Sequence, residues 1–219
     1  MTINKVLLQK IQRFPLFFPL IVLISCGNNI PKISLSLYPD GKNFAFTITE
    51  DPDYATLTQK YSVYNFLDSI GLKTTVAAWV MDNSHGSGND RSRTNTRGVT
   101  TVDTACRAFM QHLQKKGFEI CLHTVSSGND YREETREGYE LFKKQFGDYP
   151  QININHATNL EDIYWGVNRF PNGLLKICYG IFNKTDFQGE KEGSKYFWGD
   201  ICKEKTKFVR AWATGNLNT

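Results

Sequence analysis

The chain has 219 residues, which is enough for one substantial domain or at most two small ones. It is 40% hydrophobic and 22% charged, an ordinary globular composition. The net charge is only +4, and no dense run of Lys and Arg is present, so binding to nucleic acid is not expected.

The first 26 residues are typical of an export signal. Basic residues precede an apolar run over residues 14–24, which is too short to span a bilayer comfortably and fits the apolar core of a signal peptide. The run ends in LISC, which resembles the bacterial lipobox, where the cysteine receives a lipid. We therefore expect residues 1–26 to be a lipoprotein-type signal peptide ending at Cys26, and the protein to be exported and membrane-anchored in a bacterial cell envelope. An ordinary secretory signal and an uncleaved anchor are the alternatives.

Residues 27–42 form a polar linker, and residues 43–219 are expected to form the domain. The stretch NFAFTITEDPD, which begins at Asn43, alternates β-forming residues with a period of two, and this predicts a strand that Pro52 and Asp53 break. A helix should follow, because apolar residues recur on one helical face and Gly71 can close it. The face comprises Leu57, Tyr61, Tyr64 and Leu67.

Strands and helices alternate along the rest of the domain. Strands are expected at residues 72–81, 117–123, 151–156 and 207–213, and helices at residues 100–117, 131–147, 159–170 and 173–182. A polar, Gly- and Ser-rich loop over 82–98 is long enough to suggest a functional segment. The alternation predicts an α/β fold with a parallel sheet and right-handed crossovers, either open or closed into a barrel.

Residues that can bind a metal stand where three of these strands end. The first strand ends in Glu50-Asp51, and the strands at 117–123 and 151–156 end in His123 and His156. In parallel α/β folds the active site forms at the C-terminal ends of the strands. A carboxylate pair after a strand is most often a solvated turn, and a lone histidine is most often structural. Together, two carboxylates and two histidines indicate a metal site with a nearby base.

This arrangement resembles the polysaccharide deacetylase superfamily, the NodB-like carbohydrate esterases. TITEDPD stands where that family has a strand ending in Thr-Phe-Asp-Asp, and HTVSS, residues 123–127, stands where it has His-Ser/Thr-x-x-His. The stretches GFEICLHTVSSG, NHATNLEDIYWG and EGSKYFWGDICKE further resemble an uncharacterised bacterial branch. The resemblance begins near Asn43 and implies a distorted (β/α) barrel of fewer than eight strands, either complete or incomplete.

The resemblance also implies an activity. In the superfamily the first acid is the general base, and the second acid and two histidines bind a divalent metal. It thus implies Glu50 as the catalytic base, Asp51 and His123 as metal ligands, zinc as the expected metal, and a hydrolase that removes acyl groups from a cell-envelope carbohydrate. Ser127 replaces the second histidine of the motif, and His156 could supply the missing ligand.

Two other interpretations remain open, because a ligand is replaced and the chain ends where the family has further strands. One is a non-catalytic carbohydrate-binding lipoprotein on the same scaffold, and the other is an inactive truncated fragment. The sugar-stacking candidates of the binding protein would be Trp79, Tyr164, Trp165 and Trp198, for which core packing is the alternative role.

Overall fold

The structure is a computed structural model. It describes residues 41–42, 46–86, 98–157, 159–170, 173–182 and 185–210. The chain divides into two units, Met1–Ala45 and Phe46–Thr219, and the elements described below all belong to the second. The expected signal peptide, including Cys26, lies outside the described residues.

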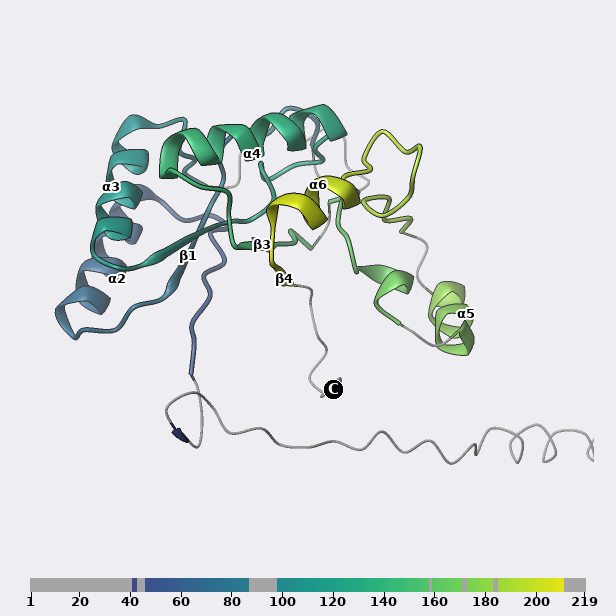
Figure 1. Ribbon diagram of the computed structural model, residues 1–219, viewed down its shortest axis with the longest axis horizontal. Coiled ribbons are helices and arrows are strands. Elements are labelled where there is room, and N and C mark those ends of the chain that lie inside the picture. The colour runs from purple at the N-terminus through teal and green to yellow at the C-terminus, as the bar shows by residue number, and fades with distance from the viewer. Residues whose placement is uncertain are drawn as a thin grey trace, which may run out of the picture. The chain divides into compact units, whose positions relative to one another are not determined.

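Four parallel strands, paired in chain order, form the sheet (Figure 1). They are β1 (Thr75–Ala78), β2 (Glu119–Leu122), β3 (Ile152–Ile154) and β4 (Phe208–Arg210). The first expected strand is reduced to a parallel bridge between Thr49 and Thr75 at the outer edge of β1. The parallel sheet confirms the α/β class, whereas its closure into a barrel stays a prediction.

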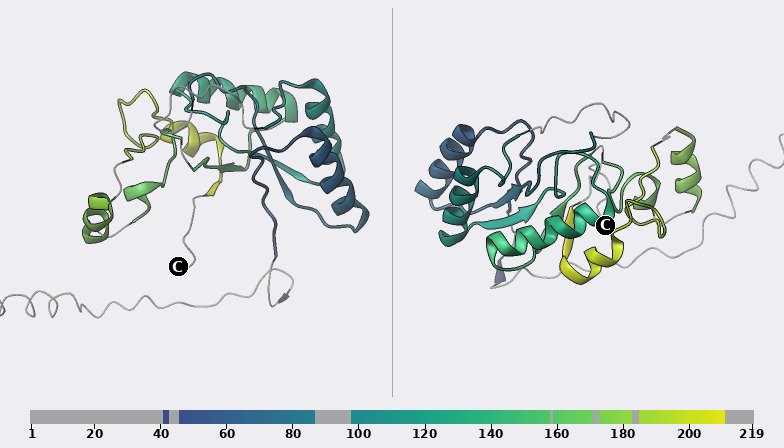
Figure 2. Two further views of the ribbon diagram at one scale, coloured as in Figure 1. Left: turned by 180° about the vertical axis from the view of Figure 1, so that it is seen from behind. Right: turned by 90° about the horizontal axis from the view of Figure 1, so that it is seen from above.

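Helices and strands share one apolar core. Figures 1 and 2 show α3 and α4 packed over the strands. The helices that contribute buried residues are α2 (Leu57–Ser69), α3 (Thr104–Lys115), α4 (Arg132–Phe146) and α6 (Gly199–Lys205). Alternate strand residues such as Val76, Ile120 and Leu122 meet them, while Ala77, Cys121 and Ile154 pack together on the opposite face. This alternation follows from the two-residue period of a strand.

Helix α4 shows why these local predictions succeed. Its apolar stripe of Thr135, Tyr139, Phe142 and Phe146 is buried, as the helical period predicts. Acidic residues lie in its first turn and lysines in its last, which matches the helix macrodipole. In α2 the prediction was partly wrong, because Tyr61 is exposed and Lys60 is buried instead.

The segment 159–170 was expected to be helical and is not. Only a short 3-10 helix, η2 (Gly166–Arg169), forms there. Tyr164 and Gly166 have φ of 54° and 58°, a left-handed conformation that interrupts a right-handed helix. The helix that follows, α5 (Gly173–Phe182), buries none of its side chains.

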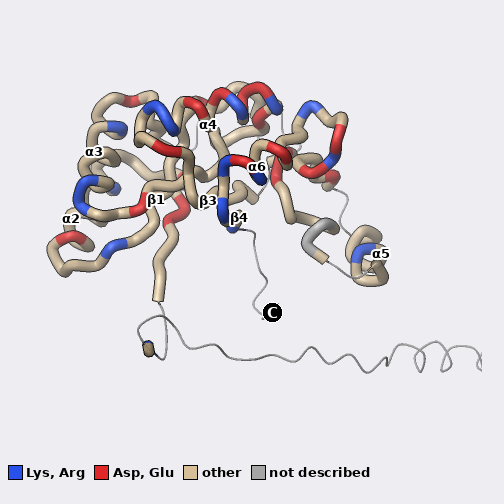
Figure 3. The backbone as a smooth tube through the Cα atoms, in the orientation of Figure 1, with Lys and Arg blue, Asp and Glu red and all other residues tan. Residues whose placement is uncertain are grey.

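Charges of both signs lie along α4 and α6, whereas the charged residues within α3 are basic (Figure 3). Within the ranges that the structure describes, no helix combines the length and the apolar character needed to cross a bilayer.

Candidate metal centre

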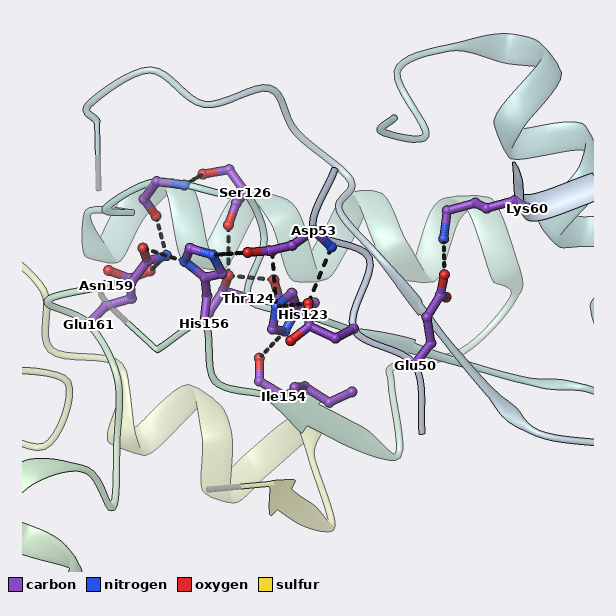
Figure 4. A network of polar contacts seen from close by, with 12 residues as sticks. Glu50, Asp53, Lys60, His123, Thr124, Ser126, Ile154, His156, Asn159 and Glu161 are labelled. Atoms are coloured by element: carbon purple, nitrogen blue, oxygen red, sulfur yellow. Dashed lines mark hydrogen bonds and ion pairs between the residues drawn. The ribbon is translucent and has the colours of Figure 1, made fainter. Parts of the chain in front are cut away.

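Three ligand-type side chains meet beyond the ends of β2 and β3. His123 follows β2 directly, His156 follows β3 by two residues, and Asp53 comes from the segment after the Thr49 bridge. One ligand atom of each lies within 4.8 Å of the others. Figure 4 shows both imidazole rings directed toward the Asp53 carboxylate. This group fits the expectation that metal-binding residues gather at the C-terminal ends of parallel strands.

The distances in this group suit ligands of a common ion. His156 Nε2 lies 3.3 Å from each Asp53 carboxylate oxygen, and His123 Nε2 lies 3.8 Å from Oδ1. His123 Nε2 is buried and has no hydrogen-bond partner among the described residues. Two ligands that each lie about 2.0–2.1 Å from a tetrahedral zinc are roughly 3.3 Å apart. The observed spacing therefore fits a metal site, and for His123 it is too long for a hydrogen bond.

The other nitrogen of each ring is held by an acceptor. His123 Nδ1 lies 3.2 Å from the carbonyl oxygen of Ile154, and His156 Nδ1 lies 3.0 Å from Oδ1 of Asn159. The Asn159 amide donates to Glu161 Oε1 at 2.8 Å, which leaves its oxygen facing His156. Both histidines thus carry their proton on Nδ1 and present the lone pair of Nε2 to Asp53, as metal-binding histidines do.

Burial and charge favour the ligand forms of these side chains. Burial lowers the pKa of His123, which is 1% exposed and stacks on Trp79 at 5.5 Å between ring centroids. Burial alone would raise the pKa of Asp53, but its interactions with the neighbouring imidazoles of His123 and His156 hold that pKa well below its usual range. A neutral imidazole and an ionised carboxylate are the protonation states that bind a metal.

The expected ligand Asp51 lies beside this group. Its Oδ1 is 3.6 Å from His123 Nε2 and accepts a hydrogen bond from the backbone N–H of Asp53 at 3.2 Å. Its side chain is 58% exposed, in contrast to the buried histidines. A cavity of about 270 Å³ adjoins it, and the lining includes Ile48, Glu50, Val63 and Tyr64.

Glu50, the expected catalytic base, is not brought to the histidines. Its Oε1 pairs with Lys60 Nζ at 2.6 Å, and its Oε2 accepts from the backbone N–H of Ala77 at 3.0 Å. Lys60 is itself buried, and Figure 4 shows Glu50 turned toward it and away from His123 and His156. Both oxygens of Glu50 are therefore engaged, and its role as base stays a prediction that this geometry does not favour.

Asp53 was not among the ligands expected from the sequence and, with Pro52, was expected only to end a strand. In the structure the backbone N–H of Ala55 donates to the carbonyl of Pro52, and Tyr54 has φ of 60°. This turn places Asp53 over the histidines. The available signal was the i, i+2 spacing of Asp51 and Asp53, which places both residues on the same side of an extended chain.

Three of the four sugar-stacking candidates are buried. Trp79, Trp165 and Trp198 lie in the interior, and Tyr164 is 44% exposed. Trp79 forms the wall behind His123, and Trp198 Nε1 donates to the carbonyl of Glu161 at 2.6 Å. The core-packing alternative is therefore correct for Trp198, which belongs to the apolar core, whereas Trp165 lines a cavity.

Comparison with known proteins found no family model, no curated protein and no solved structure that matches this chain. The resemblance to polysaccharide deacetylases accordingly stays a prediction from the motifs. What the fold and site define is a parallel α/β domain with a possible metal centre of one carboxylate and two histidines.

Proposed function

We propose that the protein is a metal-dependent hydrolase that removes acyl groups from a carbohydrate of the cell envelope. The observation that carries the proposal is that the Nε2 atoms of His123 and His156 both face Asp53, while the Nδ1 atom of each ring is hydrogen-bonded to an acceptor outside the ligand set. Two histidines and a carboxylate form a three-ligand set that is used for catalytic zinc, with the fourth position left open. A bound divalent metal supplies Lewis-acid polarisation of a carbonyl and lowers the pKa of water.

In this proposal different residues bind the metal and accept the proton. Asp53, His123 and His156 hold the metal, and the buried ring of Trp79 fixes the plane of His123. Asp51 accepts the proton of the attacking water, because its exposed carboxylate lies next to the ligand set without belonging to it.

Two lines of reasoning support an acylated envelope carbohydrate as the substrate. The TITEDPD and HTVSS motifs resemble those of carbohydrate deacetylases, and the first 26 residues are typical of an exported lipoprotein. The burial of Trp79 and Trp198 weighs against their use in the non-catalytic alternative, because a sugar-stacking platform needs exposed rings.

The test combines metal content with acetate release. The full chain, stripped with a chelator and reloaded, should hold about one zinc by elemental analysis and release acetate from acetylated oligosaccharides. Asp51→Asn should keep the zinc and reduce the rate about 10²–10⁴-fold, the usual contribution of a general base. Glu50→Gln should retain most of the activity.

The matched control is His112→Ala, which removes an exposed histidine of α3 and should change neither readout. A chain that binds no zinc, and releases no acetate with any added divalent metal, would refute the proposal. If Glu50→Gln abolished activity while Asp51→Asn did not, the base would be Glu50, as the motif resemblance implies.

A further inference from the structure

A buried carboxamide stands in the middle of β3. Ile154 packs with Ala77 and Cys121 on one face of the sheet, whereas Asn153 is in register with the core residue Leu122 on the helix-covered face. Asn153 is 1% exposed, and neither its Oδ1 nor its Nδ2 has a hydrogen-bond partner among the described residues. Burying an amide without partners is costly, and an apolar residue would be expected in its place.

Asn153 lines a small cavity enclosed by buried residues. The cavity offers about 10 Å³ to the centre of a water-sized sphere, which is room for about one water molecule or bare ion. Its wall consists of Thr124, Val125, Asp130, Thr135, Tyr139, Asn153, Glu161 and Trp198. Thr135 Oγ1 and Glu161 Oε2 also lack hydrogen-bond partners in the described part of the chain. Orphaned polar atoms of α4, β3 and the following loop thus line one space.

The cavity is also rich in carboxyl groups. Asp130 and Glu161 are both almost completely buried, and Asp162, the next residue, is buried as well. Asp130 accepts from the N–H and hydroxyl of Ser126 at 3.1 and 2.6 Å, and Glu161 Oε1 accepts from Asn159. The ion pairs of the described residues give none of these three acids a Lys or Arg partner. Burial raises the pKa of Asp130 to about 7 and the pKa values of Glu161 and Asp162 well above their usual range, and a cation in the cavity would favour the ionised carboxylates.

We propose that this cavity binds a hard metal cation of the Ca²⁺ or Na⁺ type through oxygen ligands from Asp130, Thr135, Asn153 and Glu161. The wall offers carboxylate, carboxamide and hydroxyl oxygens and no histidine or cysteine, and this set suits hard cations rather than zinc. A space for a single particle suits an ion without its water shell, which disfavours Mg²⁺ because Mg²⁺ dehydrates reluctantly. A bound water could satisfy the orphaned atoms only with protonated acids, whereas a cation would bind their ionised forms, and the experiment below distinguishes the two.

This site differs from the candidate metal centre and does not depend on the proposed hydrolase function. One chain of hydrogen bonds connects the two sites. His156 Nδ1 donates to Asn159 Oδ1, and the Asn159 amide N–H donates to Glu161 Oε1. A cation that fixes Glu161 would therefore also fix the orientation of His156.

Terbium luminescence tests the proposal, because Tb³⁺ replaces Ca²⁺ at oxygen sites and is sensitised by nearby aromatic rings. Tyr139 and Trp198 belong to the cavity wall. The full chain is first saturated with zinc, so that the centre at Asp53 is blocked, and is then titrated with Tb³⁺. We expect emission that saturates at one ion per chain and is displaced by Ca²⁺ or by Na⁺. Saturating Ca²⁺ or Na⁺ should raise the melting temperature by about 5 °C or more.

Two variants remove the ligands in different ways. Glu161→Gln removes one charge, and Asn153→Leu replaces the orphaned amide by an apolar side chain of similar size that suits a core position. Each should weaken Tb³⁺ binding at least tenfold and retain zinc, which reports that the domain is folded. Asp53→Asn is the matched control, since it changes the zinc site and should leave the Tb³⁺ emission intact.

Two results would overturn the proposal. One is a zinc-loaded chain that shows neither sensitised emission nor a rise in melting temperature with Ca²⁺ or Na⁺, and its cavity would then hold water. The other is emission that disappears in Asp53→Asn and persists in Asn153→Leu. Neither result bears on the hydrolase proposal, which is judged by zinc content and acetate release.

Discussion

The helix-covered face of the sheet and the end of the sheet beyond β2 and β3 are equally buried but are built differently. On the face, apolar side chains such as Val76, Leu113 and Leu122 fill the space between strands and helices. At the end, His123 and His156 are just as inaccessible, yet His123 keeps a ring nitrogen with no hydrogen-bond partner in the described structure. Burial at the face stabilises the fold, whereas burial at the end carries a cost that a bound ion would offset.

The comparison implies that metal binding and stability can be separated by mutation. Functional sites are where a chain retains locally unfavourable features, and the surrounding packing compensates for them. Substitutions at the end of the sheet should change metal affinity more than stability, and substitutions on the face should do the reverse.

The largest effect is expected for His123→Leu, which removes the ring nitrogen and retains most of the side-chain volume. Zinc affinity should fall about a hundredfold or more, because a zinc binding energy of about 10–16 kcal/mol is shared among about four ligands. The stability of the metal-free protein should stay the same or rise, since the unpartnered Nε2 is gone and the Ile154 carbonyl still accepts from the N–H of Thr124 at 2.9 Å. Calorimetric zinc titration and urea unfolding measure the two quantities.

Two outcomes would contradict this prediction. Unchanged zinc affinity in His123→Leu would remove His123 from the ligand set. A loss of several kcal/mol in the metal-free protein would show that the imidazole is a packing residue like those of the face. His112→Ala, on the exposed side of α3, is the control for removal of a histidine.

The converse change is Leu113→Ala in α3. Leu113 is 1% exposed and belongs to the core, so its truncation should lower the free energy of unfolding by about 2–5 kcal/mol. Zinc affinity of the folded protein should change less than about threefold. Urea unfolding in chelator, followed by zinc titration well below the denaturation midpoint, checks both. A large loss of zinc affinity would show that the face and the end are coupled.

The same contrast explains which predictions from sequence succeeded. The core stripe of α4 follows from helical periodicity, because each position depends mainly on its neighbours three and four residues away. In the α3 stripe the periodicity predicts buried Cys106, Phe109 and Leu113 correctly, whereas Val102, expected on the same face, is exposed. The positions of His123 and His156 followed from the rule that ligands gather at strand ends. The prediction of a helix over 159–170 was wrong. Its polar residues Asn159 and Glu161 turn inward and join a buried hydrogen-bond network, and periodicity cannot detect such long-range contacts.

The acids near residue 50 show a finer limit. Glu50 and Asp51 were both expected at the metal site, but adjacent residues of an extended chain point to opposite sides. Glu50 accordingly meets Lys60, and Asp51 turns toward His123. The contribution of Asp53 depends on the turn closed by the hydrogen bond from the Ala55 N–H to the Pro52 carbonyl. The sequence indicated it only through the two-residue spacing of Asp51 and Asp53, which places both on the same side of an extended chain.

A smaller effect on the metal centre is expected from Asn159→Ala. Asn159 holds Nδ1 of His156 at 3.0 Å and contacts no metal-ligating atom of Asp53 or His123. Loss of such an outer hydrogen bond typically weakens metal binding about 10–100-fold. The zinc stoichiometry should remain one per chain. Equal affinities for Asn159→Ala and the parent would show that His156 is oriented by packing alone.

The smallest effect concerns a surface contact that supports the helix-covered face from outside. Asp68, near the end of α2, pairs with Lys73 and with Lys116 at the end of α3. Hydrogen bonds from Lys116 and Lys73 lower the pKa of Asp68 from 3.8 to about 2. Because the folded-state pKa is depressed, the stabilisation is present above about pH 4 and is lost as the pH falls through about 2. Asp68→Asn should therefore be slightly less stable than the parent at pH 7, and the difference should shrink toward pH 2. Urea midpoints across this range, at low and high salt, measure it, and a difference that does not depend on pH would mean that the Asp68 side chain acts through packing rather than charge.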